Sequence, residues 1–116
     1  MSKVKLIRDS DRVYEPASGD GWTFHRSREV YVDLSSTIGA GTAVFENCRM
    51  PWHTHYDGYY RIIEGTLKIT VEGTPHVLHK HDAIFIPAGI DIVYEAGPRA
   101  SMMYAIYPVD WEQQPR

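Results

Sequence analysis

Short runs of β-type residues, each ended by glycine or proline, follow one another along most of this chain. From Val30 onward these runs are rich in valine, isoleucine, threonine, tyrosine and phenylalanine, which suit a pleated and half-buried surface. Strands separated by turn signals at intervals of roughly 8–12 residues are typical of an all-β sandwich or barrel. We predict strands over residues 30–34, 41–47, 57–63, 67–71, 76–78, 83–86, 90–96 and 101–107.

The alternation of apolar and polar residues is clearest at 67–71, where Leu67, Ile69 and Val71 share one face. Turns are predicted where glycine supplies a positive φ or proline presets the chain. These turns fall at residues 64–65, 72–75, 87–89 and 96–98. No longer segment has helical periodicity, and a helical turn is expected only within residues 110–116.

Size and composition exclude several classes of protein. The 116 residues suffice for one hydrophobic core, so we expect a single domain over residues 22–116 after a loosely ordered N-terminal segment over 1–21. A net charge of −3 without a basic run argues against nucleic-acid binding. Cys48 is the only cysteine, which excludes an internal disulfide. The absence of a long apolar run and of a secretory signal predicts a cytoplasmic protein that does not enter a membrane.

Five of the six histidines lie between positions 53 and 81. His53 and His55 are two residues apart, so on an extended chain their imidazoles point to the same face. Two neutral imidazoles on one face suit a divalent transition metal, and we treat the pair as candidate metal ligands. The other four histidines are expected to lie on the surface.

Two segments resemble the conserved motifs of the cupin superfamily. PWHTHYDGYYRIIEG, residues 51–65, is similar to the first motif, in which His-x-His precedes a glutamate and a closing glycine, here Gly65. HDAIFIPAGIDI, residues 81–92, resembles the second motif through Asp82, Pro87 and Gly89. The resemblance covers residues 40–107. It implies a small, jelly-roll-like β-barrel made of two packed antiparallel sheets.

The chain departs from the cupin pattern at its metal ligands. Gly58 stands where the usual ligand glutamate is expected, and Ile92 stands where the third histidine is expected. Only His53 and His55 remain to hold a metal such as Zn, Fe, Mn or Ni. A catalytic metal site commonly has three protein ligands, so Asp57, Tyr60 or Tyr94 would have to supply the third. The glycine at 58 leaves room into which the Tyr60 phenol would point.

The segment YDGYYRIIEG and the C-terminal Tyr104, Pro108 and Trp111 are similar to one branch of cupins, the ethanolamine utilization protein Q type. Members of this branch commonly lack the usual cupin metal ligands. The resemblance implies a place in ethanolamine-type catabolism, and acetate kinase activity has been ascribed to a member.

Two functions follow from these patterns, both centred on a small polar metabolite bound in the barrel mouth. In the first, His53 and His55 hold a metal, and Tyr60 or Asp57 transfers a proton to or from the metabolite. In the second, the chain is a metal-free ligand-binding or accessory cupin without turnover. The expected lining comprises His53, His55, Tyr60, Phe45, Met50, Ile92 and Met103.

A homodimer is also expected. Apolar and aromatic residues around Trp22, Tyr59, Ile63 and Trp111, together with the N-terminal segment, predict the interface between the two copies.

Overall fold

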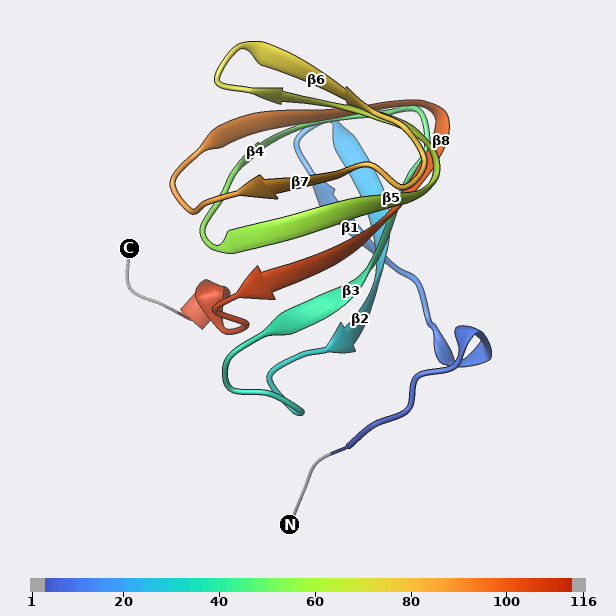
Figure 1. Cartoon of the computed structure of the whole chain (residues 1–116), viewed down its shortest axis with the longest axis vertical. Helices are drawn as coiled ribbons and strands as arrows, with labels where there is room; N and C mark the ends of the chain where they lie inside the picture. Colours follow the sequence, from blue (N-terminus) through green and yellow to red (C-terminus); the bar gives the residue numbers. More distant parts are fainter. Residues whose placement is uncertain (1–3, 114–116) are drawn as a thin grey trace.

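The computed structural model describes residues 4–113 and consists almost wholly of antiparallel strands (Figure 1). No helix among these residues is long and apolar enough to cross a membrane. Two short 3-10 helices, η1 and η2, lie near the ends of the chain. The elements are η1 Asp9–Asp11, β1 Glu15–Gly19, β2 Trp22–Val30, β3 Gly39–Phe45, β4 Cys48–His53, β5 Asp57–Val71, β6 Thr74–Leu78, β7 Ala83–Ile86, β8 Asp91–Tyr107 and η2 Trp111–Gln113.

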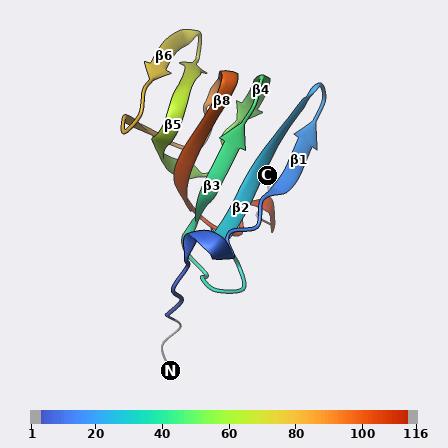
Figure 2. The same ribbon diagram turned by 90° about the vertical axis from the view of Figure 1, so that its right-hand side faces the viewer.

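Two long strands, β5 and β8, pair with each other along most of their length and take part in both layers of the fold (Figure 2). In the first layer, the C-terminal half of β8 pairs with β3, which continues through β2 to β1, while the N-terminal half of β5 pairs with β7. In the second layer, the other halves of β8 and β5 pair with β4 and β6. The expected all-β fold of two packed antiparallel sheets is confirmed, although hydrogen bonding does not close it into a complete barrel.

The bend that carries β5 from one layer to the other lies at Gly65. The register between β5 and β8 shifts between Ile62 and Glu64 and again between Gly65 and Leu67. Gly65 has φ +78°, and a Cβ at this position would meet the backbone carbonyl of Arg99. A glycine is therefore needed for both the left-handed conformation and the close approach of the two backbones. The predicted turn at 64–65 was wrong, because the chain bends here without leaving the sheet.

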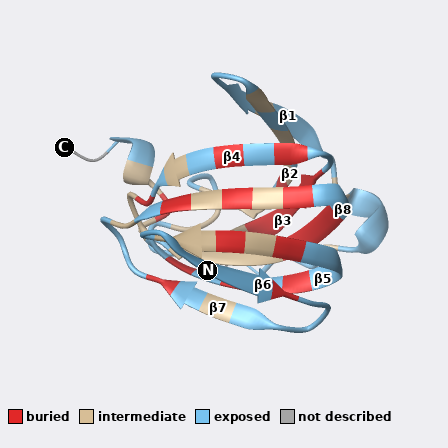
Figure 3. Cartoon of the chain, turned by 90° about the horizontal axis from the view of Figure 1, so that it is seen from above, coloured by how far each residue is buried: buried red, intermediate tan, exposed pale blue. Residues whose placement is uncertain are grey.

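The facing sides of the two layers enclose the hydrophobic core (Figure 3). On β5, Tyr60 and Ile62 point inward from one half and Leu67 and Ile69 from the other, all nearly inaccessible to solvent. The core also contains Cys48, and its burial raises the pKa of the thiol, as expected of a small apolar residue rather than a nucleophile.

The four histidines at positions 25, 76, 79 and 81 are exposed, which confirms the expectation that they lie on the surface.

Several strand predictions differ from the structure. Residues 31–34 form a turn, in which the Leu34 and Ser35 amides donate to the Tyr31 carbonyl at 2.9 Å. Strands β1, β2 and β4 were missed, because charged residues and proline interrupt their apolar pattern. β1 lies inside segment 1–21, which was expected to be loosely ordered. It pairs residue by residue with β2, so the sheet begins before the expected domain boundary at residue 22.

Candidate functional site

A cavity of about 240 Å³ opens between the two layers, bounded mainly by β2, β3, β4, β5, β8 and η2. Ten of its lining residues are aromatic. Histidine, cysteine, aspartate and glutamate are the side chains that commonly bind metals, and among the described lining residues Glu112 alone belongs to these types. The cavity walls are therefore suited to an organic molecule more than to a metal ion.

Tryptophans from three separate elements form one end of the cavity. Trp22 at the start of β2 contacts Trp52 of β4 edge to face, with ring centroids 6.4 Å apart. Trp52 contacts Trp111 of η2 in the same manner at 5.9 Å. Such aromatic pairs hold one another's orientation in addition to burying apolar surface. They give this end of the cavity a defined shape.

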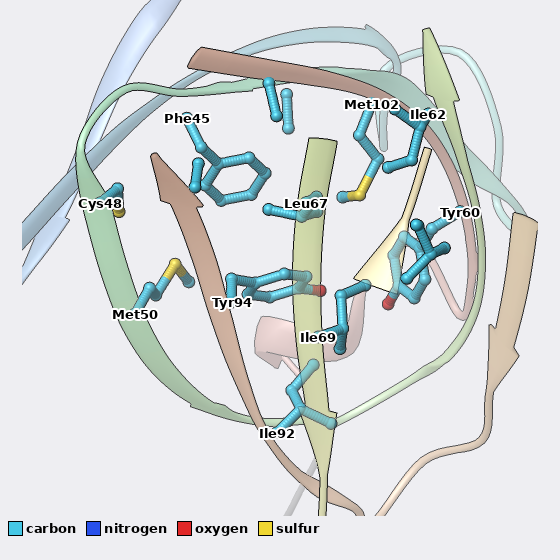
Figure 4. Close-up of a cluster of buried hydrophobic side chains, with 14 of the residues drawn as sticks. Phe45, Cys48, Met50, Tyr60, Ile62, Leu67, Ile69, Ile92, Tyr94 and Met102 are labelled. Atoms are coloured by element: carbon cyan, nitrogen blue, oxygen red, sulfur yellow. The ribbon is translucent and has the colours of Figure 1, made fainter. Parts of the chain in front are cut away.

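Tyr60 extends from β5 into the interior, and its hydroxyl is the polar atom that most clearly lacks a partner. The oxygen is buried and has no hydrogen bond of acceptable geometry among the described residues. Figure 4 shows the Tyr60 and Tyr94 hydroxyls pointing toward one another across the interior. Burial, followed by the neighbouring Tyr56, raises the pKa of Tyr60 far above its usual range. The phenol is thus held neutral, close to the hydroxyls of Tyr56 and Tyr94.

Gly58 explains how Tyr60 reaches this position. A Cβ built at residue 58 would collide with the Tyr60 hydroxyl and with the adjoining ring carbon. The ring of Tyr60 therefore fills the space that a larger side chain at 58 would take. This confirms the expectation that the Tyr60 phenol points into the room left by Gly58.

Other tyrosines surround the same space. The indole nitrogen of Trp52 donates to the Tyr56 hydroxyl at 2.9 Å, which fixes that ring at the cavity wall. Burial raises the pKa of Tyr94 well above 10, with Tyr60 adding to the rise. Burial also raises the pKa of Tyr104 to about 12, although Arg26 and Arg28 act in the opposite direction. At neutral pH these phenols are all uncharged hydrogen-bonding groups.

Two arginines on β2 bring positive charge to the cavity. Arg28 lies against the ring of Tyr31, with its guanidinium carbon 4.3 Å from the ring centroid. Arg26 lies opposite the inward-facing Ala43 of β3 and lowers the pKa of the cavity residue Tyr56 against the effect of burial. Within residues 4–113, no carboxylate forms an ion pair with Arg26.

His53 and His55 lie outside the cavity. Along β4, Met50 and Trp52 point inward, so His53 points outward, where its Nδ1 donates to Asp91 Oδ1 at 2.7 Å. His55 follows in a bend and stacks on Trp111 with ring centroids 5.5 Å apart. The two imidazoles are neighbours, with centroids 5.2 Å apart, as the spacing predicts. Their expected place in the cavity lining was wrong, because β4 presents its even-numbered residues to the interior.

Asp57 and Tyr60 lie on opposite faces of β5. Asp57 is exposed, and its carboxylate accepts a hydrogen bond from the Ala88 amide at 2.9 Å. The carboxylate therefore holds the turn after β7 and does not reach the Tyr60 phenol. The structure therefore separates Asp57 from Tyr60, and proton transfer by either residue stays a prediction.

The remaining lining expectations are partly correct. Phe45 and Met50 line the cavity, as expected. Ile92 is buried in the core without lining the cavity, and Met103 lies on the other face of β8 from the lining residue Met102. Trp22 and Trp111, expected at a dimer interface, instead line the cavity.

Sequence patterns missed Arg26 because β2 itself was missed. Its position two residues beyond Phe24 and four beyond Trp22 was the available signal.

The described residues do not fit the metal centre considered from sequence. No group of three histidine, cysteine, aspartate or glutamate residues between positions 4 and 113 is arranged to share one ion. Tyr60 and Tyr94, two of the candidate third ligands, point into the interior, whereas His53 points outward from β4, so the cavity wall separates them from the imidazole.

Comparison with known proteins gives consistent matches. A family model described as "Ethanolamine utilisation protein EutQ" matches residues 19–113. "Acetate kinase EutQ" of Escherichia coli is 30% identical over 80 residues, which are 69% of this chain and 34% of that protein. The Clostridioides difficile protein of the same name is 31% identical over 83 residues, or 72% of this chain and 53% of that protein. The chain thus spans between a third and about half of these relatives.

A solved structure shows the same fold. The Clostridium difficile EutQ protein superimposes with a TM-score of 0.75 at 26% identity, covering 92% of this chain and 83% of that one.

Proposed function

The chain belongs to the ethanolamine utilisation protein EutQ family, with a cupin fold, and on this basis we propose that it binds a small organic molecule in the cavity between its two layers without a metal ion at that place. The observation that carries the proposal is the largely aromatic cavity of about 240 Å³, whose lining includes Tyr60 with its buried hydroxyl. Concave, mainly apolar sites with a few converging polar groups are the usual form of small-molecule sites.

The size of the cavity limits the ligand. A dry protein cavity of roughly 150 Å³ holds a benzene molecule. A cavity of about 240 Å³ therefore suits a molecule of about ten non-hydrogen atoms, smaller than a nucleotide. This argues for a single small metabolite bound between the layers.

The Tyr60 hydroxyl gives the ligand a polar contact. A buried hydroxyl without a partner costs about 1–3 kcal/mol relative to its hydrated state. Because burial raises the pKa of Tyr60, the phenol keeps its proton and acts as a hydrogen-bond donor. A ligand that brings an acceptor to this oxygen recovers much of that cost.

The metal-dependent alternative receives less support from the side chains. His53 is engaged by Asp91 on the outer face, and the cavity wall offers aromatic rings and arginines where a metal would require imidazoles and carboxylates. We therefore favour a ligand-binding or accessory role, serving the ethanolamine-type catabolism after which the family is called. The kinase activity in the relatives' names belongs to longer proteins, of which the matched segments make up only 34% and 53%.

Binding of cyclohexylmethanol, a neutral alcohol of eight non-hydrogen atoms, tests this proposal. Trp22, Trp52 and Trp111 line the cavity, so their fluorescence reports its occupation. We expect EDTA-treated protein to bind the probe, and Tyr60→Phe to weaken binding about tenfold by removing one hydrogen bond. The matched control is Tyr59→Phe, the next residue on β5, whose side chain is on the outer face.

Three outcomes would overturn the proposal. One is no binding at millimolar probe concentration. Another is equal loss of affinity in the Tyr59→Phe and Tyr60→Phe variants. The third is binding that appears only after a transition metal is added.

A further inference from the structure

Arg26 places a positive charge without an ion-pair partner among the described residues in a cavity lined mainly by aromatic and aliphatic side chains. We propose that the bound molecule is a monocyclic aromatic carboxylate, with its carboxylate on Arg26 and its ring among the cavity tryptophans and tyrosines. This inference rests on the function proposed above and specifies the chemical class of the ligand.

The position of Arg26 is set by the alternation along β2. Trp22, Phe24 and Arg26 are successive inward residues, and all three line the cavity. Arg26 is partly buried, where water compensates its charge less completely than at the surface. A ligand carboxylate would supply the missing counter-charge, and the planar guanidinium can bind both carboxylate oxygens at once.

The nearby acidic residues are committed to other partners. Glu29 points to the opposite face of β2, where it accepts hydrogen bonds from Arg12 Nε and from the Thr42 hydroxyl, each at 2.9 Å. Glu112 lies at the exposed rim and accepts a bond from the Tyr31 hydroxyl at 3.3 Å. Neither carboxylate forms an ion pair with Arg26. The positive charge is therefore available to a ligand.

Arg28 makes a weaker second candidate for the anion. Its guanidinium already lies over the Tyr31 ring, and the residue as a whole is exposed. Its charge adds to the positive potential at this end of the cavity without providing the principal contact. Glu112 at the rim partly offsets that potential.

The walls favour an aromatic ring over an aliphatic one. Phe24 and Phe45 stack with ring centroids 5.2 Å apart, and Phe45 stacks in turn on Tyr94 at the same separation. Together with the edge-to-face tryptophans, these rings offer both faces and edges to a bound ring. Benzoate has nine non-hydrogen atoms, which agrees with the size limit of about ten set by the cavity volume.

The phenols can complete the anion site. The hydroxyls of Tyr60 and Tyr104 remain protonated at neutral pH, because burial raises the pKa of each. A protonated phenol donates a hydrogen bond to a carboxylate, whereas a phenolate would repel it. Arg26 acts electrostatically on Tyr104, so its charge and the Tyr104 donor lie at the same end of the ligand.

Four probes separate the contribution of charge from that of the ring. Benzoate and cyclohexanecarboxylate carry the charge, whereas benzyl alcohol and cyclohexylmethanol are neutral. Binding is measured by calorimetry at neutral pH and constant ionic strength. We expect benzoate to bind at least tenfold more tightly than benzyl alcohol, and at least twofold more tightly than cyclohexanecarboxylate.

Substitution at Arg26 assigns the charge effect to one residue. Arg26→Met keeps most of the apolar stem and should weaken benzoate binding at least tenfold, while benzyl alcohol binding changes less than twofold. Arg61→Met is the matched control, because Arg61 is exposed on the outer face of β5. If Arg26→Met fails to fold, Arg26→Lys keeps the charge but loses the planar fork, and should weaken benzoate binding by a smaller factor.

Each result has a distinct meaning. Benzoate binding no tighter than benzyl alcohol, or equally affected by Arg61→Met, would overturn the role of Arg26. Cyclohexanecarboxylate binding equal to benzoate would overturn the preference for an aromatic ring. If none of the four probes binds, the small-molecule function itself fails, and not merely the assignment of its ligand class.

Discussion

Gly58 and Tyr60 should be energetically coupled, because the Tyr60 ring occupies the space where a side chain at 58 would project. Adding a Cβ at residue 58 creates overlap with the Tyr60 hydroxyl and ring. Gly58→Ala alone should therefore lower the free energy of unfolding by about 1–3 kcal/mol, the range for overpacking a core. Gly58 is absent from the residues with positive φ, so no left-handed strain contributes to this cost.

The same substitution should have the opposite effect once the ring is gone. In a Tyr60→Leu background no ring opposes the new methyl group, and alanine within a strand is favoured over glycine by about 0.5–1 kcal/mol. The expected coupling between the two positions is therefore about 1.5–4 kcal/mol. Tyr60→Phe should give only partial relief, because the ring carbon next to the lost hydroxyl also lies too close to the Cβ position.

Urea unfolding of the four variants of this double-mutant cycle measures the coupling. Tryptophan fluorescence and far-ultraviolet circular dichroism should report coincident transitions if unfolding is two-state. A cost for Gly58→Ala that is equal in both backgrounds, within about 0.5 kcal/mol, would show that the ring does not occupy this space.

Three further predictions concern the tyrosines, the histidines and the surface. Burial raises the folded-state pKa of Tyr60 and Tyr94 above 10.0, so their contribution to stability is complete below pH 10 and should be lost above it. The expected loss in the free energy of unfolding is up to about 1.4 kcal/mol per pH unit for each tyrosine. Urea midpoints independent of pH between 9 and 12 would contradict this. Untagged protein should contain less than about a tenth of an equivalent of metal by elemental analysis, since two imidazoles do not make a three-ligand site. Stoichiometric metal that is lost in a His53→Ala, His55→Ala variant would refute that expectation. Phe85 of β7 is paired with Tyr59 of β5, and both side chains are exposed, so a dimer through this face should give twice the 13.3 kDa chain mass in light scattering, falling to the monomer mass in Phe85→Arg. A monomeric native chain would rule out the dimer.

The overall fold could be predicted because strand and turn signals are local. The alternation at 67–71 identifies one half of β5, whose inward Leu67 and Ile69 are fully buried. The two predicted strands on either side of Gly65 proved to be one bent strand. Their union depends on a close approach between Gly65 and the backbone at Arg99, which no local pattern contains.

The candidate site was harder to predict because it depends on which face of each strand turns inward. A shift of one residue in the phase of β4 exchanges every inward and outward side chain. The spacing of His53 and His55 correctly placed their rings side by side, yet it carried no information about which face of β4 packs on the core. Trp52, between Pro51 and His53, is the residue that enters the cavity.

By itself, the sequence determined an all-β chain with a cupin-like order of strands, a single cysteine and a tyrosine beside a glycine gap. These features are local, since they depend on alternation, turn residues and the absence of a side chain at Gly58. Only the tertiary structure decided that Arg26 faces the tyrosines of β5 and β8 and that His53 does not. The reason is physical: the cavity is made by packing two sheets together, and its charge and its donors come from strands whose facing sides are fixed only when the layers meet.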